Sequence, residues 1–159
     1  MSADRGGGGP TTGQEVPVRR RFEPPESDAG APFWAGSRER ELRIPWCEAC
    51  GRPHWFPREG CPHCLSNRIE WRPASGEATV YACSVMPKPA MPMLADRVPY
   101  VVALVELAEG VRMLTNIVGV DDPFKVSIGD AVTLRWEELT DGRHLPVFTP
   151  AATPIQPPR

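Results

Sequence analysis

The sequence predicts a mainly β protein with a short N-terminal helix, a zinc-binding module and a five-stranded barrel, and three observations support this prediction. Two C-x-x-C pairs stand close together in the first half of the chain. Five segments with strand-like patterns follow them, without the spacing of βαβ units. The length of 159 residues suits one domain, or one domain with a small satellite module.

The N-terminal region is rich in glycine and proline and carries few large apolar side chains. Such a segment buries too little surface to offset the entropy lost on ordering, so a disordered tail is expected over residues 1–31. A second flexible tail is expected over residues 151–159, which are again rich in proline.

A short helix is predicted from Pro32 to about Leu42, within a helical segment of residues 32–45. Proline is favoured in the first turn of a helix, and Glu and Arg residues follow at spacings that allow ion pairs. Pro45 is expected to end the helical segment, because a proline inside a helix removes a backbone donor and clashes with the preceding turn.

Four cysteines follow the pattern C-x2-C-x10-C-x2-C, namely Cys47, Cys50, Cys61 and Cys64. Each pair lies on a predicted tight turn that points both sulfurs at one spot, and the second pair completes a tetrahedron. Zn²⁺ suits four thiolates at about 2.3 Å, and four protein ligands leave no position for water or substrate. The spacing therefore predicts a structural zinc site in a ribbon of residues 46–72.

Three alternatives stay open for these cysteines. Two disulfides would need an oxidising compartment, but the start of the chain lacks an apolar signal segment, so a cytoplasmic protein is expected. An iron centre of the rubredoxin type uses similar ligands. His54 or His63 could replace one sulfur, although four cysteines already satisfy the ion.

Residues 73–150 show the pattern of a small barrel. Gly and Pro turn signals separate segments that are rich in β-branched and apolar residues. The predicted strands are 78–85, 100–107, 111–118, 131–137 and a last one that carries Leu145, Val147 and Phe148. Five strands joined by hairpin turns favour a closed barrel of the OB type, with an SH3-like barrel or a small sandwich as competing folds.

A long loop is predicted over residues 86–99, which contain four prolines and three methionines. Loops of this length inside a compact domain are usually functional. Met91 and Met93, together with Phe33 and Trp34, are predicted to dock a partner, because methionines adapt to irregular interfaces and aromatic rings anchor them. Alternatively, the methionines fold over the barrel mouth and the aromatic rings pack on the metal module.

The sequence contains no catalytic motif of the H-E-x-x-H, G-x-S-x-G or phosphate-loop type. Cys83 lies in an apolar segment, which predicts a small buried hydrophobe. His144 is the one histidine outside the metal module. Glu137 and Glu138 are adjacent in a predicted strand, so they face opposite sides and form no acid–base pair. The chain is therefore expected to be non-catalytic on its own.

The charge distribution argues against a nucleic-acid-binding barrel. The formal net charge is −2. Residues 38–72 hold seven arginines and five acidic residues, a net of +2, whereas residues 76–149 hold six basic and ten acidic residues, a net of −4. A barrel that follows a phosphate backbone needs a positive groove. The sequence also lacks an apolar run long enough to span a membrane.

Several motifs occur in an order that resembles a known family. They are the two cysteine pairs with Phe56-Pro57-Arg58 between them, Pro99-Tyr100-Val101-Val102-Ala103, Ile128-Gly129-Asp130 and Leu145-Pro146-Val147-Phe148. In this order they resemble the OB-fold proteins with a rubredoxin-like zinc ribbon known as "domain of unknown function thirty-five". The resemblance covers about residues 32–150.

This resemblance implies an accessory role in acyl-CoA metabolism. Members look like partners of thiolase-fold enzymes, among them thiolases, synthases and aldolases that cleave steroid side-chain thioesters, and some work beside an enoyl-CoA hydratase. The zinc ligands carry over to the four cysteines, and no catalytic residue carries over. Acyl-CoA is the ligand implied, shared with the partner, and Lys88 and Arg97 are predicted to contact its phosphates.

The sequence departs from the family pattern at two turns. Leu65 follows the last cysteine where a small Gly-Ser turn is often seen, and Ala78 stands where a second glycine is common. Two rival functions are a single-stranded nucleic-acid or transcription-associated module, and a self-sufficient acyl-CoA enzyme that uses Cys83 or His144.

Overall fold

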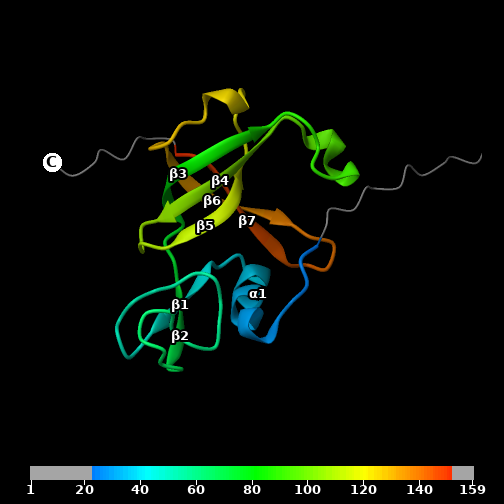
Figure 1. Cartoon of the computed structure of the whole chain (residues 1–159). Coiled ribbons are helices and arrows are strands. Elements are labelled where there is room, and N and C mark those ends of the chain that lie inside the picture. The colour runs from blue at the N-terminus through cyan, green and yellow to red at the C-terminus, as the bar shows by residue number, and fades with distance from the viewer. Residues whose placement is uncertain (1–22, 152–159) are drawn as a thin grey trace, which may run out of the picture.

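The computed structural model describes residues 23–151 and places a small metal-binding module beside a closed β-barrel (Figure 1). The predicted tails at residues 1–22 and 152–159 lie outside the described residues. The helix and the strands are α1 (Ala31–Arg38), β1 (Arg43–Cys47), β2 (Ile69–Pro73), β3 (Glu77–Met86), β4 (Tyr100–Leu107), β5 (Arg112–Ile117), β6 (Ala131–Glu138) and β7 (His144–Pro150). Short 3-10 turns, η1 to η3, occupy Asp28–Gly30, Pro92–Arg97 and Pro123–Lys125.

The predicted helix is present but ends earlier than expected. Pro32 lies in its first turn, as predicted, and α1 ends at Arg38. The expectation that Pro45 ends a helical segment is wrong, because Pro45 lies inside strand β1 and pairs in register with Trp71 of β2. Proline is tolerated in a strand at a sheet edge, and the β1–β2 sheet has only two strands.

The barrel has the predicted five strands, in the order β3-β4-β5-β7-β6. All pairs are antiparallel except β5 with β7, which are parallel and meet at Ile117 and Phe148. Strand β3 has a register shift between Val80 and Ala82 and closes the barrel by pairing with both β4 and β6. This order of five strands, with one parallel contact, confirms the OB-type barrel.

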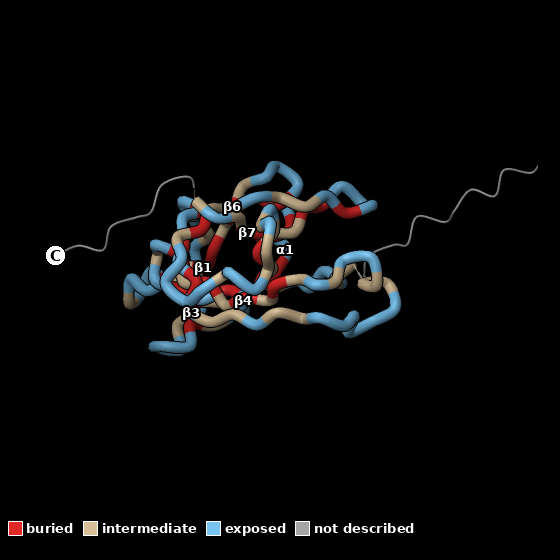
Figure 2. Tube along the Cα trace, turned by 90° about the horizontal axis from the view of Figure 1, so that it is seen from above, coloured by how far each residue is buried: buried red, intermediate tan, exposed pale blue. Residues whose placement is uncertain are grey.

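The core is continuous from α1 and β1 into the barrel. Buried residues alternate with partly exposed ones along β4, as expected for a strand with one face in the barrel interior. Phe148, Val105 and Ile44 are completely buried. Figure 2 shows buried residues in the interior and exposed residues along the loops. Because Ile44 and Phe33 belong to the same apolar cluster as the barrel residues, the two parts share one core.

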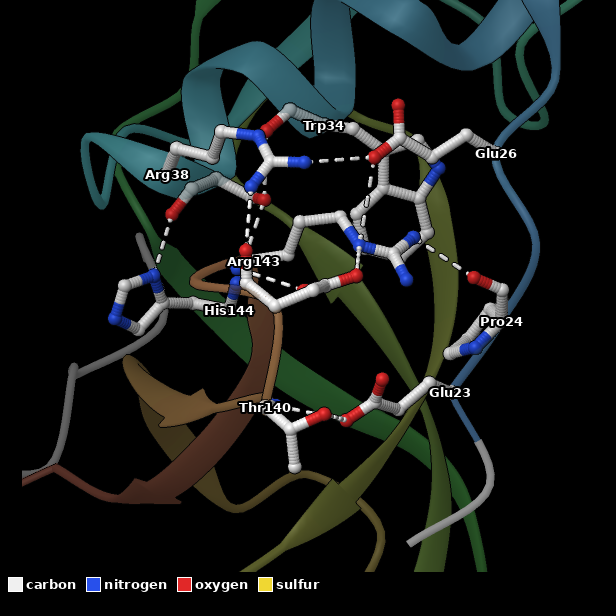
Figure 3. Close-up of polar contacts among 10 residues, drawn as sticks. Glu23, Pro24, Glu26, Trp34, Arg38, Thr140, Arg143 and His144 are labelled. Atoms are coloured by element: carbon white, nitrogen blue, oxygen red, sulfur yellow. Dashed lines mark hydrogen bonds and ion pairs between the residues drawn. The ribbon is translucent and has the colours of Figure 1, made fainter.

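An N-terminal strap, defined here as residues Glu23–Glu26, is held against the end of the barrel (Figure 3). Glu23 accepts hydrogen bonds from the backbone N–H and the hydroxyl of Thr140, at 2.7 and 2.6 Å. Arg143 donates to the carbonyl of Pro24 at 2.7 Å, and its guanidinium lies 4.4 Å from the centre of the Trp34 indole ring. The expectation of a disordered tail up to residue 31 is therefore wrong from residue 23 onwards.

Within residues 23–151, no helix is both long enough and apolar enough to cross a membrane.

Candidate functional site

The two C-x-x-C turns bring all four predicted cysteine ligands together. The Sγ atoms of Cys47 and Cys64 lie 3.6 Å apart, and those of Cys50 and Cys61 lie 3.7 Å apart. All four sulfurs are within 4.8 Å of one another. A Zn²⁺ ion about 2.3 Å from each of four sulfurs holds them about 3.8 Å apart, so the cluster fits a tetrahedral zinc site.

Each turn of the cluster is built in the same way. The N–H of Gly51 donates to the carbonyl of Cys47 at 2.8 Å, and the N–H of Leu65 donates to the carbonyl of Cys61 at 2.9 Å. Both closing residues have positive φ, +69° at Gly51 and +62° at Leu65. The first turn thus has the glycine that this conformation favours, whereas the second turn has a leucine.

Two thiols of the cluster have pKa values that are shifted in opposite directions. Burial acts to raise the pKa of the Cys47 thiol, but hydrogen bonds from the backbone of Cys50 and the thiol of Cys64 outweigh it and bring the pKa to about 7. Burial raises the pKa of Cys50 to about 12. A metal ion binds the deprotonated forms, so it would release protons from the whole cluster.

The two histidines near the cluster are not needed as ligands. His63 is exposed, and its Nε2 atom lies 3.3 Å from the carbonyl of Pro53. His54 is buried, and burial lowers its pKa. The cluster of ligating atoms found among the described residues consists of the four cysteines alone. A site with four protein ligands is closed, so it has no coordination position for a reacting molecule.

Phe33 and Trp34 are both buried, contrary to the prediction that they dock a partner. The Phe33 ring contacts the rings of Trp34 and Trp55 edge to face, with centroids 4.8 and 5.3 Å away. These contacts join α1 to the loop between the two cysteine pairs. The alternative, that the aromatic residues pack on the metal module, describes Phe33 correctly.

An apolar groove runs along β5, and no local sequence pattern indicates it. A cavity of about 690 Å³ lies against the 86–99 loop, and a second cavity of about 260 Å³ lies next to the metal-binding module. The groove is defined here as these two cavities together, since they share four lining residues, Pro24, Leu114, Asn116 and Leu145. Its walls come from segments far apart in sequence, so only the folded chain assembles it.

The loop residues singled out from the sequence are placed differently around this groove. Met91 lines the larger cavity and is exposed, whereas Met93 is half-buried and does not line it. Arg97 also lines the larger cavity, and its guanidinium is ion-paired with Glu137. Lys88 is exposed and lies outside the lining of either cavity.

His144 and Cys83 have structural partners. The Nδ1 atom of His144 lies 2.9 Å from the carbonyl of Ser37, and its Nε2 accepts a hydrogen bond from Arg40 at 3.3 Å. Because a carbonyl can only accept, Nδ1 carries the proton. The thiol of Cys83 lies 3.6 Å from the carbonyl of Val126. These contacts join α1 to β7, and β3 to the 123–128 loop.

Comparisons with known proteins agree with this architecture. Residues 34–70 match the family described as "ChsH2, rubredoxin-like zinc ribbon domain", and residues 71–137 match "ChsH2, C-terminal OB-fold domain". The solved structure "Ltp2-ChsH2(DUF35) aldolase" contains a similar chain, with a TM-score of 0.72 and 40% identity. The similarity covers 80% of this chain and 98% of that chain.

Two kinds of curated relative are found. A "Probable enoyl-CoA hydratase alpha subunit" from Thermomonospora curvata is 39% identical over 138 residues, which are 87% of this chain and 42% of the relative. The chain thus spans about two fifths of the length of that subunit. A "DUF35 domain-containing scaffold protein" from Methanocaldococcus jannaschii is 37% identical over 113 residues, which are 68% of this chain and 79% of the relative.

The cysteine cluster, the order of the barrel strands and these matches lead to one assignment. The chain belongs to the DUF35 family and combines a rubredoxin-like zinc ribbon with an OB-fold domain of the ChsH2 type.

Proposed function

We propose that the chain is a non-catalytic accessory subunit that binds and supports a thiolase-fold enzyme acting on acyl-CoA thioesters. The partner would be a thiolase, a synthase or an aldolase, with lipid or steroid side-chain degradation as the setting. The observation that carries this proposal is the similarity to the ChsH2(DUF35) chain of an aldolase, which extends over 98% of that chain. Relatives described as scaffold proteins support the same role.

We assign the four cysteines to a structural Zn²⁺ ion. The sulfur spacing fits a tetrahedral site, and the ribbon family supports the choice of metal. When bound, the ion would cross-link the two cysteine turns and fix the ribbon beside α1. A structural zinc site of this kind contributes on the order of 10 kcal/mol to folding. A reducing compartment keeps such thiols available, so we place the protein in the cytoplasm.

The proposal extends to acyl-CoA as a ligand shared with the partner. Lys88 is an exposed cation in the loop beside the groove, and Arg97 lines the groove. Contact of Arg97 with a CoA phosphate would compete with its ion pair to Glu137. Similarity to hydratase alpha subunits adds an enoyl-CoA hydratase as a second partner of the complex.

Co-expression tests this function directly. The chain is expressed with and without a thiolase-fold enzyme from the same host, and each preparation is assayed for thioester turnover. We expect the chain alone to have no turnover and the pair to co-purify as an active complex. Full activity of the enzyme without this chain, or turnover by the chain alone that Cys83→Ser abolishes, would contradict the proposal.

A further inference from the structure

Strand β5 has an open edge where the barrel is least tightly closed. It pairs with β4 along its whole length, but it meets β7 in register only at Ile117 and Phe148. One more backbone hydrogen bond, from Val118 to Phe148 at 2.7 Å, continues that contact. Towards the metal-binding module, the two strands are joined by a side chain in place of backbone pairing. The hydroxyl of Thr115 in β5 donates to the carbonyl of Pro146 in β7 at 2.8 Å.

The register shows which backbone groups face this open edge. The N–H of Leu107 donates to the carbonyl of Val111 at 2.9 Å, so residues 107 and 111 form a hydrogen-bonded antiparallel pair. Hydrogen-bonded pairs alternate with non-bonded ones. Since Met113 and Thr115 follow the same alternation, they bond to β4. The backbone N–H and C=O of Leu114, between them, therefore point towards β7.

Strand β7 does not complete the ladder at this point. Pro146 lies on the β7 side of the gap, and proline has no backbone N–H to donate. The smaller cavity of the groove is lined by residues of both strands, among them Leu114 of β5 and Pro146 of β7. Pro146 therefore cannot donate a backbone hydrogen bond to β5 here, and the smaller cavity borders β5 at this point.

The surroundings of the open edge are apolar and electrically neutral. Leu114 is 63% exposed and Phe56 is 60% exposed, and both side chains line the smaller cavity. Among the residues that line the groove, the one charged side chain is Arg97, which is ion-paired with Glu137. No charged side chain lines the smaller cavity, so a complementary occupant of that cavity carries no charge, offers apolar side chains and supplies backbone donors and acceptors.

We propose that an extended, uncharged apolar segment of the partner enzyme adds as a strand to the β5 edge at Leu114 and places its side chains in the smaller cavity of the groove. Backbone pairing gives such an added strand affinity, and pockets for alternate side chains give it specificity. The inference rests on the proposed function and names the surface by which the partner binds.

Two matched variants test this surface. Leu114→Asp puts a charge on an exposed side chain beside the open edge. Ile128→Asp does the same at a side chain that is 71% exposed on the loop after η3, which lies at the far end of the barrel from the zinc ribbon (Figure 1). We expect Leu114→Asp to weaken binding of the co-purified thiolase-fold enzyme by about tenfold or more, as for a central interface residue, and Ile128→Asp to leave it unchanged. Equal melting temperatures check that both variants are folded.

Hydrogen exchange distinguishes strand addition from side-chain contact alone. We expect the amide of Leu114 to exchange at least about tenfold more slowly in the complex, because an added strand engages it. Unchanged exchange there, or equal binding by both variants and the unaltered chain, would overturn the inference and leave the accessory function standing. If the unaltered chain binds no thiolase-fold enzyme, both proposals fail. A homodimer that Leu114→Asp converts to a monomer would assign the groove to a second copy instead.

Discussion

Leu65 adopts a left-handed backbone conformation in the zinc ribbon, at a turn position that favours glycine. It closes the second cysteine turn with a φ of +62° and is 87% exposed, so its side chain adds little packing in return for the strained backbone. Its counterpart, Gly51, adopts almost the same conformation without a Cβ atom. The sequence already showed Leu65 where the family often has a small Gly-Ser turn. The positive φ explains why a glycine suits this turn better than leucine.

Leu65→Gly is predicted to stabilise the zinc-loaded protein by about 1 kcal/mol. Removal of the side chain relieves a left-handed conformation that costs an L-residue roughly 1–2 kcal/mol, and the extra freedom of glycine in the unfolded chain offsets part of the gain. The urea midpoint measures the change. Gly51→Ala is the matched control and is expected to lower the midpoint, since nothing lies within 4 Å of the added Cβ and only the backbone is strained.

The zinc ribbon is an element that its own sheet cannot stabilise. Strands β1 and β2 form a two-stranded sheet, and an isolated pair of strands is marginally stable in water. Packing of Ile44 and Phe33 into the common core adds apolar burial. The metal is expected to supply the largest single contribution, because it links two turns that are eleven residues apart, from Cys50 to Cys61.

Cys61→Ala is predicted to abolish metal binding and to unfold the ribbon. Cys61 is buried and supplies one of four thiolates, so its loss leaves an open site and a cavity. Elemental analysis gives the zinc content of the reduced protein, and thermal unfolding gives its stability. Cys83→Ala is the control, because Cys83 lies outside the cluster and its loss should leave the zinc content unchanged. Normal zinc content and normal melting in Cys61→Ala would contradict the metal assignment.

At the scale of the whole molecule, the strap, α1 and the β6–β7 turn form one polar joint (Figure 3). Arg143 is almost completely buried in this joint and pairs with Asp141 at 2.6 Å. Its guanidinium also contacts Pro24 and Trp34. Because Pro24 lines both cavities, the joint also fixes one wall of the groove.

Acidification is predicted to loosen this joint. Hydrogen bonds from Thr140 lower the pKa of Glu23 from its ordinary value of 4.5, and a backbone hydrogen bond from Arg143 lowers that of Asp141 from 3.8. A carboxyl group whose pKa is lower in the folded state stabilises the protein above its unfolded pKa, and this contribution is lost as the pH falls through the folded value. Stability should therefore fall below about pH 4.

Glu23→Gln isolates the contribution of one carboxylate. We expect it to lower the free energy of unfolding at pH 7 and to have a smaller effect at pH 3, because protonation of Glu23 in the unfolded chain, with its ordinary pKa of 4.5, offsets part of the carboxylate's contribution there. Urea titrations of both proteins at the two pH values measure this difference. An effect of equal size at both pH values would show that the carboxylate charge does not hold the strap.

Local patterns in the sequence determined the metal cluster and the barrel strands. The spacing of two C-x-x-C pairs needs only tight turns to converge, and alternating apolar residues need only a common interior. The turn geometry and the apolar alternation depend on neighbours a few residues apart, so the sequence alone was sufficient to predict the cysteine cluster and the strands. The resemblance to the family added the expected partner.

The tertiary structure decided what depends on distant segments. Pro45 became part of a strand because Trp71 was available to pair with it, and Phe33 became buried because Trp55 covers it. The strap is held by residues more than a hundred positions away, and the groove forms where β7 fails to pair with β5. No local pattern specifies such contacts. They form only if packing between distant segments outweighs the entropy lost when the intervening loops close, and this balance depends on the whole chain.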